Sequence, residues 1–138
     1  MASGSCYCGN VRIELTGEPV TASLCHCLDC RKLTGGPFSY NVVVKISDLK
    51  ITGDPKQVSK TGDSGSEIKN YFCSECGTPV YAQKIKASGE PEEITIVRAG
   101  VFDEVTGRKP TAELFTKSRL NWVAPLEGAD QFPAMVQL

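Results

Sequence analysis

The sequence carries seven cysteines in three short groups, a spacing that is typical of metal sites. Cysteine thiolates bind zinc in tetrahedral geometry, with a sulfur–zinc distance of about 2.3 Å. Because seven is odd, a framework made only of disulfides would leave one thiol over. We therefore interpret the cysteines as zinc ligands. The groups are Cys6-x-Cys8, Cys25-x-Cys27-x-x-Cys30 and Cys73-x-x-Cys76.

The two pairs supply the four ligands of one closed site. Such a site would tie the N-terminus to a point about 65 residues further along the chain, and its binding energy would be folding energy. Gly77 follows the second pair and can take the positive φ that lets the backbone curl behind a metal, and Gly9 stands in the same place after the first pair. A redox role for the C-x-x-C pair is the alternative, and its β-rich surroundings argue against it. The ligands of the predicted structural site are Cys6, Cys8, Cys73 and Cys76.

The triplet Cys25, Cys27 and Cys30 is one ligand short of a tetrahedral site. Three protein ligands with a fourth position open to substrate or water are the pattern of catalytic zinc. A second structural zinc, or a fourth thiol borrowed from another group, stays an alternative. In an extended segment His26 points away from its two cysteine neighbours. We expect it to be a packed or outer-shell group rather than a ligand.

The segments between the cysteines are short and mostly of β type. Residues 11–15 place Val and Ile side chains on one face and Arg12 and Glu14 on the other, as in a half-buried strand. Glycine- and proline-containing turns separate such segments, and residues 28–33 could form one short helical turn. A mostly β single domain over residues 1–138 is predicted, with strands at 11–15, 38–44, 49–52, 67–72, 79–85, 94–102 and 111–116.

Composition restricts the classes of partner. The 138 residues include 41% hydrophobic and 22% charged residues, with a net charge of −1, as in a soluble globular protein. The sequence has no excess of basic residues that would indicate binding to nucleic acid. No apolar run approaches the roughly 20 residues of a membrane helix, and the first residues lack a secretory pattern. We expect a cytoplasmic protein that binds neither nucleic acid nor membrane.

Five segments resemble the glutathione-dependent formaldehyde-activating enzyme family, which is also named for the centromere protein V domain. The ordered set C-x-C-G, C-H-C-x-x-C-R and F-C-x-x-C-G-T is highly specific. The segments span nearly the whole chain and are "GSCYCGNVRIEL" (4–15), "CHCLDCRKLTGG" (25–36), "YFCSECGTPVY" (71–81), "RAGVFDE" (98–104) and "ELFTKSRLNWV" (113–123).

This resemblance implies an all-β fold similar to the Mss4-like β-tent. It also implies the same division of the cysteines, with the two pairs structural and the triplet at a catalytic zinc. The named activity is carbon–sulfur lyase chemistry that joins formaldehyde and glutathione as S-(hydroxymethyl)glutathione. Family members often carry a histidine in the segment where this chain has Glu113 or Phe115. Any substrate contact of that histidine is lost or reassigned here.

Basic side chains are expected to balance the thiolates and to hold substrate carboxylates. Arg31 and Lys32 directly follow Cys30, and arginine binds a carboxylate through a bidentate fork. Asp103 is expected to be a turn residue or to orient a site arginine, and Trp122 is expected in the core rather than in a pocket wall. The predicted substrate contacts are Arg31, Arg98 and Arg119, with Lys117 as a further candidate.

Two functions of different classes follow from these residues. The first is a zinc-dependent carbon–sulfur lyase acting on a thiol adduct, glutathione-like or otherwise, or a related transferase. The second is a non-catalytic β module in which both zincs are structural and the surface binds a protein. A cytoskeletal role would need a basic tail, which this sequence lacks.

Overall fold

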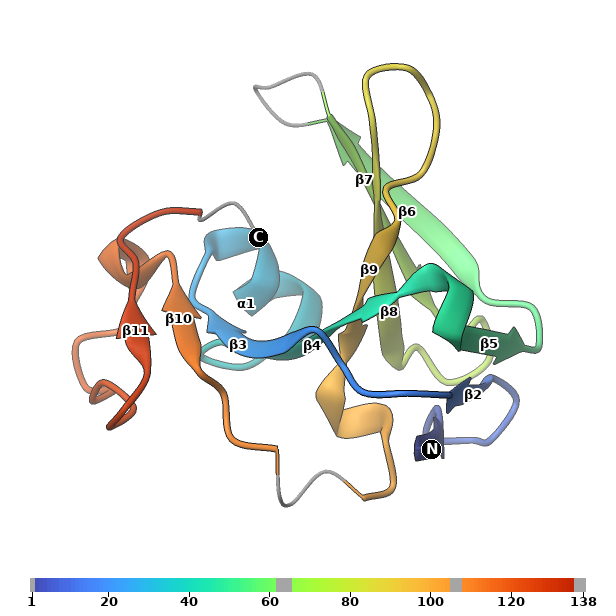
Figure 1. Cartoon of the computed structure of the whole chain (residues 1–138), viewed down its shortest axis with the longest axis horizontal. Coiled ribbons are helices and arrows are strands. Elements are labelled where there is room, and N and C mark those ends of the chain that lie inside the picture. Colours follow the sequence, from blue (N-terminus) through green and yellow to red (C-terminus); the bar gives the residue numbers. More distant parts are fainter. Residues whose placement is uncertain (1, 62–65, 105–107, 136–138) are drawn as a thin grey trace.

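The computed structural model describes residues 2–61, 66–104 and 108–135 and contains strands, one α-helix and three short 3-10 turns in this part of the chain (Figure 1). The helix α1 spans Leu28–Thr34, and the 3-10 turns span Ile46–Asp48, Ala99–Val101 and Thr116–Ser118. The strands are β1 Ala2–Ser5, β2 Arg12–Leu15, β3 Thr21–Cys25, β4 Ser39–Lys45, β5 Leu49–Thr52, β6 Lys56–Thr61, β7 Glu67–Phe72, β8 Pro79–Ile85, β9 Ile94–Arg98, β10 Ala112–Leu114 and β11 Asp130–Gln131.

The strands form two sheets. The smaller has the order β1-β2-β5, and the larger has the order β11-β10-β3-β4-β9-β8-β7-β6. Most neighbouring strands are antiparallel, whereas β10 runs parallel to both β3 and β11. Figure 1 shows β10 and β11 beside β3 at one end of the larger sheet and β6 and β7 at the other. The predicted mostly β fold is confirmed.

The core lies between the two sheets and follows the alternation of β2. Ile13 and Leu15 are 1% and 2% exposed, while Arg12 and Glu14 face solvent. They pack in one cluster with side chains of the larger sheet, such as Val42, because alternate residues of a strand share one face. Burying a side chain of this size stabilises the fold by about 1.5–3 kcal/mol.

Four strands were not predicted from the sequence: β1, β3, β6 and β11. The side chains of β6 are all exposed, so this strand has no apolar alternation to detect. It is an edge strand that carries Lys56 and Lys60, and lysine is a common protection against pairing with another chain. The prediction for residues 94–102 was too long, because β9 ends at Arg98 and a 3-10 turn follows.

The predicted helical turn at residues 28–33 is the helix α1. Its N-cap is Cys27, whose Sγ accepts a hydrogen bond from the Cys30 backbone N–H at 3.2 Å. Its C-cap is Gly35, with a left-handed φ of 70° and an N–H that donates to the Arg31 carbonyl. One cysteine therefore starts the helix and the next lies in its first turn.

Trp122 corrects a prediction about the core. Its side chain is 71% exposed, so the expected core position is wrong. The residue lies in a turn that follows the last 3-10 segment, where no other element covers it. A residue's size and type are only a statistical guide to burial.

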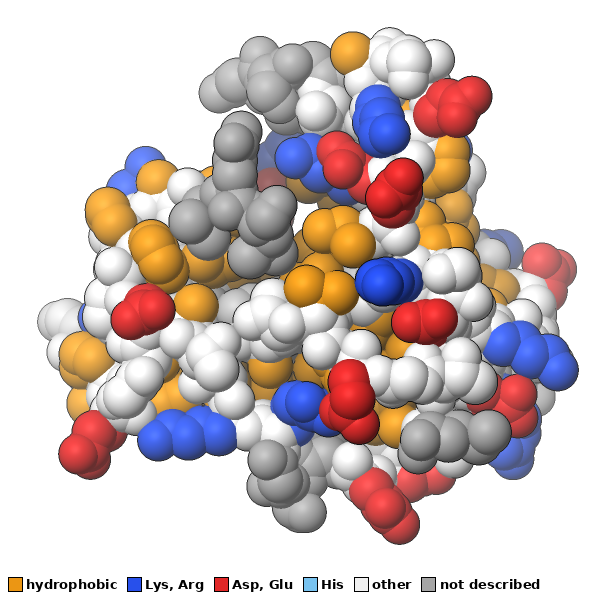
Figure 2. Space-filling view, in the orientation of Figure 1, with side chains coloured by type: hydrophobic (Ala, Val, Ile, Leu, Met, Phe, Trp, Pro, Cys, Tyr) orange, Lys and Arg blue, Asp and Glu red, His pale blue; other side chains and the backbone are white. Residues whose placement is uncertain are grey.

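The surface shown in Figure 2 carries acidic and basic side chains interspersed with apolar ones. No α-helix in the described ranges has both the length and the apolar character to cross a membrane.

Candidate metal centres and their surroundings

The two cysteine pairs meet at one point. The turn after β1 carries Cys6 and Cys8, and the turn between β7 and β8 carries Cys73 and Cys76. The Sγ atoms of Cys6 and Cys8 are 3.6 Å apart, those of Cys8 and Cys73 are 3.7 Å apart, and all four lie within 4.8 Å of one another. Tetrahedral zinc with bonds of about 2.3 Å separates its sulfurs by about 3.8 Å. The four thiols therefore fit one zinc ion.

Backbone geometry supports this closed cluster. Gly77 and Gly9 have φ values of 78° and 84°, as expected from their places after the cysteine pairs. The Cys6 Sγ accepts a hydrogen bond from the Val11 N–H at 3.3 Å, and the Cys73 Sγ accepts one from the Glu75 N–H at 3.4 Å. Such donors favour the thiolate, which is the form that binds metal.

The triplet forms a second cluster on β3 and α1. Cys25 ends β3, Cys27 caps α1 and Cys30 lies within the helix, and their Sγ atoms lie within 4.8 Å of one another. Within residues 2–61, 66–104 and 108–135, no other Cys, His, Asp or Glu side chain joins them. The triplet can therefore supply three ligands to a tetrahedral ion, one fewer than the closed cluster.

Proton affinity within the triplet is strongly uneven. Hydrogen bonds from Cys25 and Cys27, then from Ser39, and the charge of Arg98 lower the pKa of Cys30 far below the usual thiol value. Hydrogen bonding to Cys27 and Cys30, together with burial, raises the pKa of Cys25. Three such close thiols cannot all ionise without a positive charge. Binding a divalent cation would remove this conflict.

Arg98 is a buried cation beside the triplet. It is 9% exposed and lies on β9, opposite Asn41 of β4. Its Nη1 donates to the Asn41 Oδ1 at 2.7 Å, and its Nη2 donates to the Asn70 Oδ1 at 3.2 Å. Of the ion pairs in the described part of the chain, none includes Arg98. Two neutral amides thus orient a positive charge that no carboxylate neutralises there.

A small cavity of about 110 Å³ adjoins this arginine. Arg98 and Asn70 supply its polar wall, and Leu33 reaches it from α1, one turn after Cys30. Tyr71 and Tyr81 also line it and stack with their ring centroids 4.3 Å apart. The cavity therefore lies against the face of the larger sheet and meets the triplet's helix only at Leu33. No cysteine of the triplet lines it, and Gly77, beside the closed cluster, does.

Arg31 and Arg119, two further predicted substrate contacts, have different surroundings. Arg31 lies in α1, and its Nε is buried without a hydrogen-bond partner in the described ranges. Arg119 donates from Nη2 to the Glu113 Oε2 at 3.0 Å and also bonds Gln131. Arg119 therefore belongs to a different polar cluster from Arg98.

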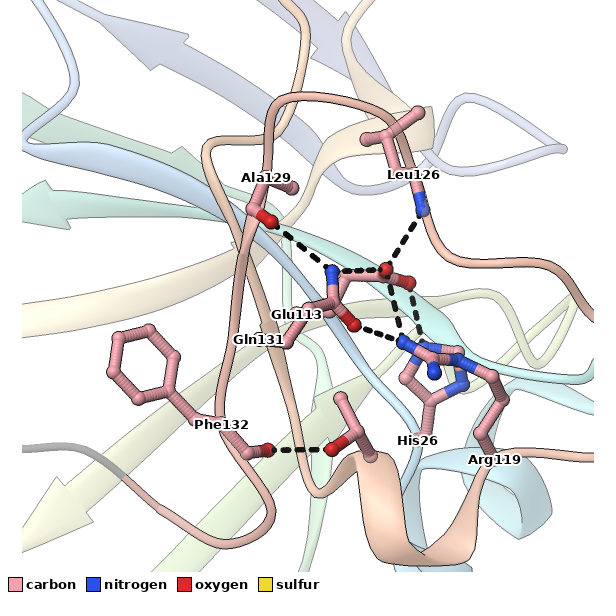
Figure 3. Close-up of polar contacts among 8 residues, drawn as sticks. His26, Glu113, Arg119, Leu126, Ala129, Gln131 and Phe132 are labelled. Atoms are coloured by element: carbon pink, nitrogen blue, oxygen red, sulfur yellow. Dashed lines mark hydrogen bonds and ion pairs between the residues drawn. The ribbon is translucent and has the colours of Figure 1, made fainter.

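That second cluster surrounds Glu113 (Figure 3). The His26 Nε2 lies 2.8 Å from the Glu113 Oε1, and these two side chains are 0% and 1% exposed. Figure 3 shows His26, Arg119 and Gln131 converging on this carboxylate. His26 is thus a packed group that faces a carboxylate. At the position where the resemblance left Glu113 or Phe115 open, Glu113 is the residue that contacts His26. Phe115 follows β10 and has a φ of 54°.

Burial of Glu113 opposes its ionisation. Hydrogen bonds from the Leu126 N–H, His26 and Gln131, together with the charge of Arg119, outweigh burial and lower the pKa of Glu113 to about 2. The carboxylate is therefore ionised at neutral pH. Sequence reasoning did not find this cluster, although one signal was present: a glutamate in the otherwise apolar strand segment "AEL".

Fold and clusters together define a mostly β protein with a closed and an open cysteine site of metal-binding geometry. Comparison with known families identifies the family of the chain. The profile of the glutathione-dependent formaldehyde-activating enzyme family matches residues 1–118. The chain belongs to this family.

Individual proteins also resemble the chain. A protein of Emericella nidulans is 31% identical over 80 residues and one of Sordaria macrospora is 27% identical over 84 residues, and both carry the name "Putative glutathione-dependent formaldehyde-activating enzyme". Each match covers 56% of this chain but only 40% and 35% of the relative. A crystal structure of a Rhodobacter sphaeroides protein aligns with a TM-score of 0.53 and 23% identity, over 94% of this chain and 98% of the other. This last match shows a shared fold.

Proposed function

We propose that this protein is a zinc-dependent carbon–sulfur lyase that forms and cleaves an adduct between a thiol and a small aldehyde. The synthesis of S-(hydroxymethyl)glutathione from glutathione and formaldehyde is the proposed example. The observation that carries this proposal is the open triplet beside a buried cation, in a chain of this family. A zinc ion held by the triplet would act as a Lewis acid and accept the substrate sulfur as a thiolate.

The protein's own residues supply charge balance and orientation in this proposal. Three thiolates on a divalent ion leave a formal charge of −1, and a substrate thiolate would make it −2. Arg98 lies on the face of the sheet that carries Cys25, and its charge favours the thiolate of Cys30. Asn41 and Asn70 hold its guanidinium in place, so the positive charge needs little reorganisation during the reaction.

About 110 Å³ is room for small groups beside the arginine. We propose that the aldehyde reaches the triplet from this cavity, past Leu33 of α1, while the thiol sulfur binds at the triplet itself. The remainder of the thiol compound would lie outside, where Arg31 is a proposed contact for a carboxylate. Arg119 is the weaker of the predicted substrate contacts, because its Nη2 already binds Glu113 and Gln131 and its Nε is buried.

The proposed reaction balances without a further reactant. In the synthetic direction, the thiol sulfur bonds to the aldehyde carbon, and the thiol proton ends on the former carbonyl oxygen. In the reverse direction the carbon–sulfur bond breaks and the hydroxyl proton returns to sulfur.

The first experiment counts zinc and measures the rate of this reaction. Two zincs per chain are expected, and the protein is expected to accelerate the exchange between glutathione, formaldehyde and their adduct in NMR exchange spectra. Cys27→Ser should abolish the acceleration and leave one zinc. Lys50→Ala, a change at an exposed ion pair with Glu14 on the smaller sheet, is the matched control and should behave as the wild type. One zinc in the wild type, or unchanged acceleration by Cys27→Ser, would contradict the proposal and favour a non-catalytic binding module. A folded two-zinc protein inactive on this pair would leave a lyase or transferase acting on another small molecule.

A further inference from the structure

We infer that Glu113 is a positioning residue for the triplet, acting through His26 from the other side of the segment that carries Cys25 and Cys27. This inference rests on the proposed function, because it assumes that the triplet holds a metal ion. Glu113 is not one of the expected ligands, and nothing in the motif pattern assigns it a role. The structure places its carboxylate directly behind the ligand segment.

His26 is held on three sides. Its Nε2 meets the Glu113 Oε1 at 2.8 Å, and its ring packs edge-on against Phe38 with centroids 5.3 Å apart. Its backbone N–H donates to the Leu114 carbonyl at 3.0 Å, which continues the pairing of β3 with β10. Because His26 lies between Cys25 and Cys27, any shift of its ring or backbone moves both neighbouring sulfurs.

The carboxylate of Glu113 is itself fixed by the C-terminal part of the chain (Figure 3). Its Oε2 accepts hydrogen bonds from the Gln131 Nε2 at 2.7 Å, the Leu126 N–H at 2.9 Å and the Arg119 Nη2 at 3.0 Å. These three donors hold one oxygen, so the other oxygen is presented to His26 in one orientation. The segment from Arg119 to Gln131 thereby supports the ligand segment through Glu113 and His26.

The chemistry of Glu113 also selects one form of His26. An ionised carboxylate only accepts hydrogen bonds, so the His26 Nε2 must be the donor. The His26 Nδ1 is buried and has no partner in the described ranges, and a lone pair there is less costly than an N–H. Outer-shell partners of this kind orient ligand segments, and changing them typically lowers metal affinity about 10–100-fold.

Glu113→Gln is the informative substitution. The glutamine oxygen would turn toward the three donors, so its NH₂ group would face the His26 Nε2. That nitrogen would then have to accept, and the proton would move to Nδ1, where no acceptor is present among the described residues. We therefore expect His26 to shift and the triplet to loosen, while the distant four-cysteine site stays unchanged.

The test follows zinc release from the fully loaded protein to a chromogenic chelator. A fast phase from the triplet and a slow phase from the closed site are expected in the wild type. Glu113→Gln should speed the fast phase about 10–100-fold and leave the slow phase unchanged. Thr95→Val is the matched control, since it removes another buried hydrogen bond, from the Thr95 Oγ1 to the Ala82 carbonyl at 2.7 Å. It should change neither phase.

A double-mutant cycle tests the route through His26. His26→Phe alone should also speed the fast phase, and adding Glu113→Gln should then have no further effect. When loaded with cobalt, Glu113→Gln should differ from the wild type in the d–d absorption of the three-sulfur site and not in that of the four-sulfur site. If Glu113→Gln fails to fold, Glu113→Asp keeps the charge, shortens the reach to His26 and is judged by the same criteria.

The possible failures are distinguishable. One zinc in the wild type overturns the proposed function and this inference together. Two zincs with an unchanged fast phase in Glu113→Gln overturn only the role of Glu113. The role of Glu113 is also overturned if Glu113→Gln has an equally large effect in the His26→Phe background, because the effect would then not pass through His26. It is overturned as well if both phases accelerate equally, because general destabilisation would then explain the result.

Discussion

The two cysteine clusters use the same ligand type at different distances along the chain. In the closed cluster, Cys8 and Cys73 are 65 residues apart, whereas the triplet draws all its thiols from six consecutive positions, 25–30. Closing the longer loop removes more freedom from the unfolded chain, a difference of about 2 kcal/mol because the cost grows with the logarithm of loop length. The closed cluster is therefore suited to stabilise the fold, and the triplet is suited to chemistry because it contributes little to holding distant segments together.

The groups that surround the two clusters also differ. Backbone N–H groups serve the sulfurs of the closed cluster, for example Val11 N–H on Cys6. Near the triplet lie a buried arginine and the carboxylate–histidine pair of Glu113 and His26. The triplet also has one backbone donor, the Cys30 N–H on the Cys27 Sγ, but its charged neighbours come from β9 and β10, which are distant in sequence. This difference teaches that the number of ligands is a local property of the sequence, whereas the charges around them depend on the fold.

The largest expected effect contrasts one substitution in each cluster. Cys73→Ser should leave the chain largely unfolded in circular dichroism, because a structural zinc contributes on the order of 10 kcal/mol to folding. Cys27→Ser should stay folded, since serine can still cap α1. If both variants unfold to the same extent, both clusters are structural and the proposed difference between them is wrong.

Acid should reveal the contribution of Glu113 behind the triplet. Its pKa falls from about 4.5 in the unfolded chain to about 2 in the fold, so its stabilisation is present above about pH 4.5 and is lost as pH falls toward 2. The shift corresponds to on the order of 3 kcal/mol. In urea unfolding at pH 6, 5 and 4, the difference in unfolding free energy between wild type and Glu113→Gln should begin to shrink at the lowest pH. A constant difference would argue against an ionised, hydrogen-bonded carboxylate.

A substitution of Arg98 tests whether its positive charge contributes to the reaction at the open cluster. Arg98→Gln keeps a hydrogen-bond donor for the flanking asparagines but removes the charge, so kcat/KM for adduct formation should fall about 100-fold. Arg12→Gln changes an exposed arginine of β2 and serves as the control. Two bound zincs together with wild-type kcat/KM in Arg98→Gln would show that the buried charge has no part in the reaction.

The smallest effect compares two glycines. Gly77 beside the closed cluster and Gly35 at the end of α1 have φ values of 78° and 70°, with open space around an added Cβ. Alanine at either position should cost about 1 kcal/mol, because the left-handed conformation disfavours a side chain. Thermal unfolding should register both costs, and only Gly77→Ala should speed the slow zinc phase. Faster release of the triplet's zinc in Gly77→Ala would contradict the expectation that the two clusters hold their metal independently.

Local patterns in the sequence predicted much of the fold. Strand β2 was predicted because its apolar residues alternate. The positive φ values of Gly9 and Gly77 were predicted because the backbone must curl behind a metal after each cysteine pair. Strand β6 has no such alternation, since both of its faces are exposed. Trp122 was misplaced because burial depends on which other segments cover a residue, and the residue type does not specify them.

The sequence by itself determined the cysteine spacing, the glycines that follow the pairs and the family to which the motifs belong, because each depends on residues that are neighbours along the chain. Only the tertiary structure decided that Arg98 of β9 lies beside Cys30 and that Glu113 of β10 meets His26. Strand order and register bring these groups together, and both arise from packing of the whole sheet. The same seven thiols thus form two clusters whose different surroundings come from strands far away in sequence.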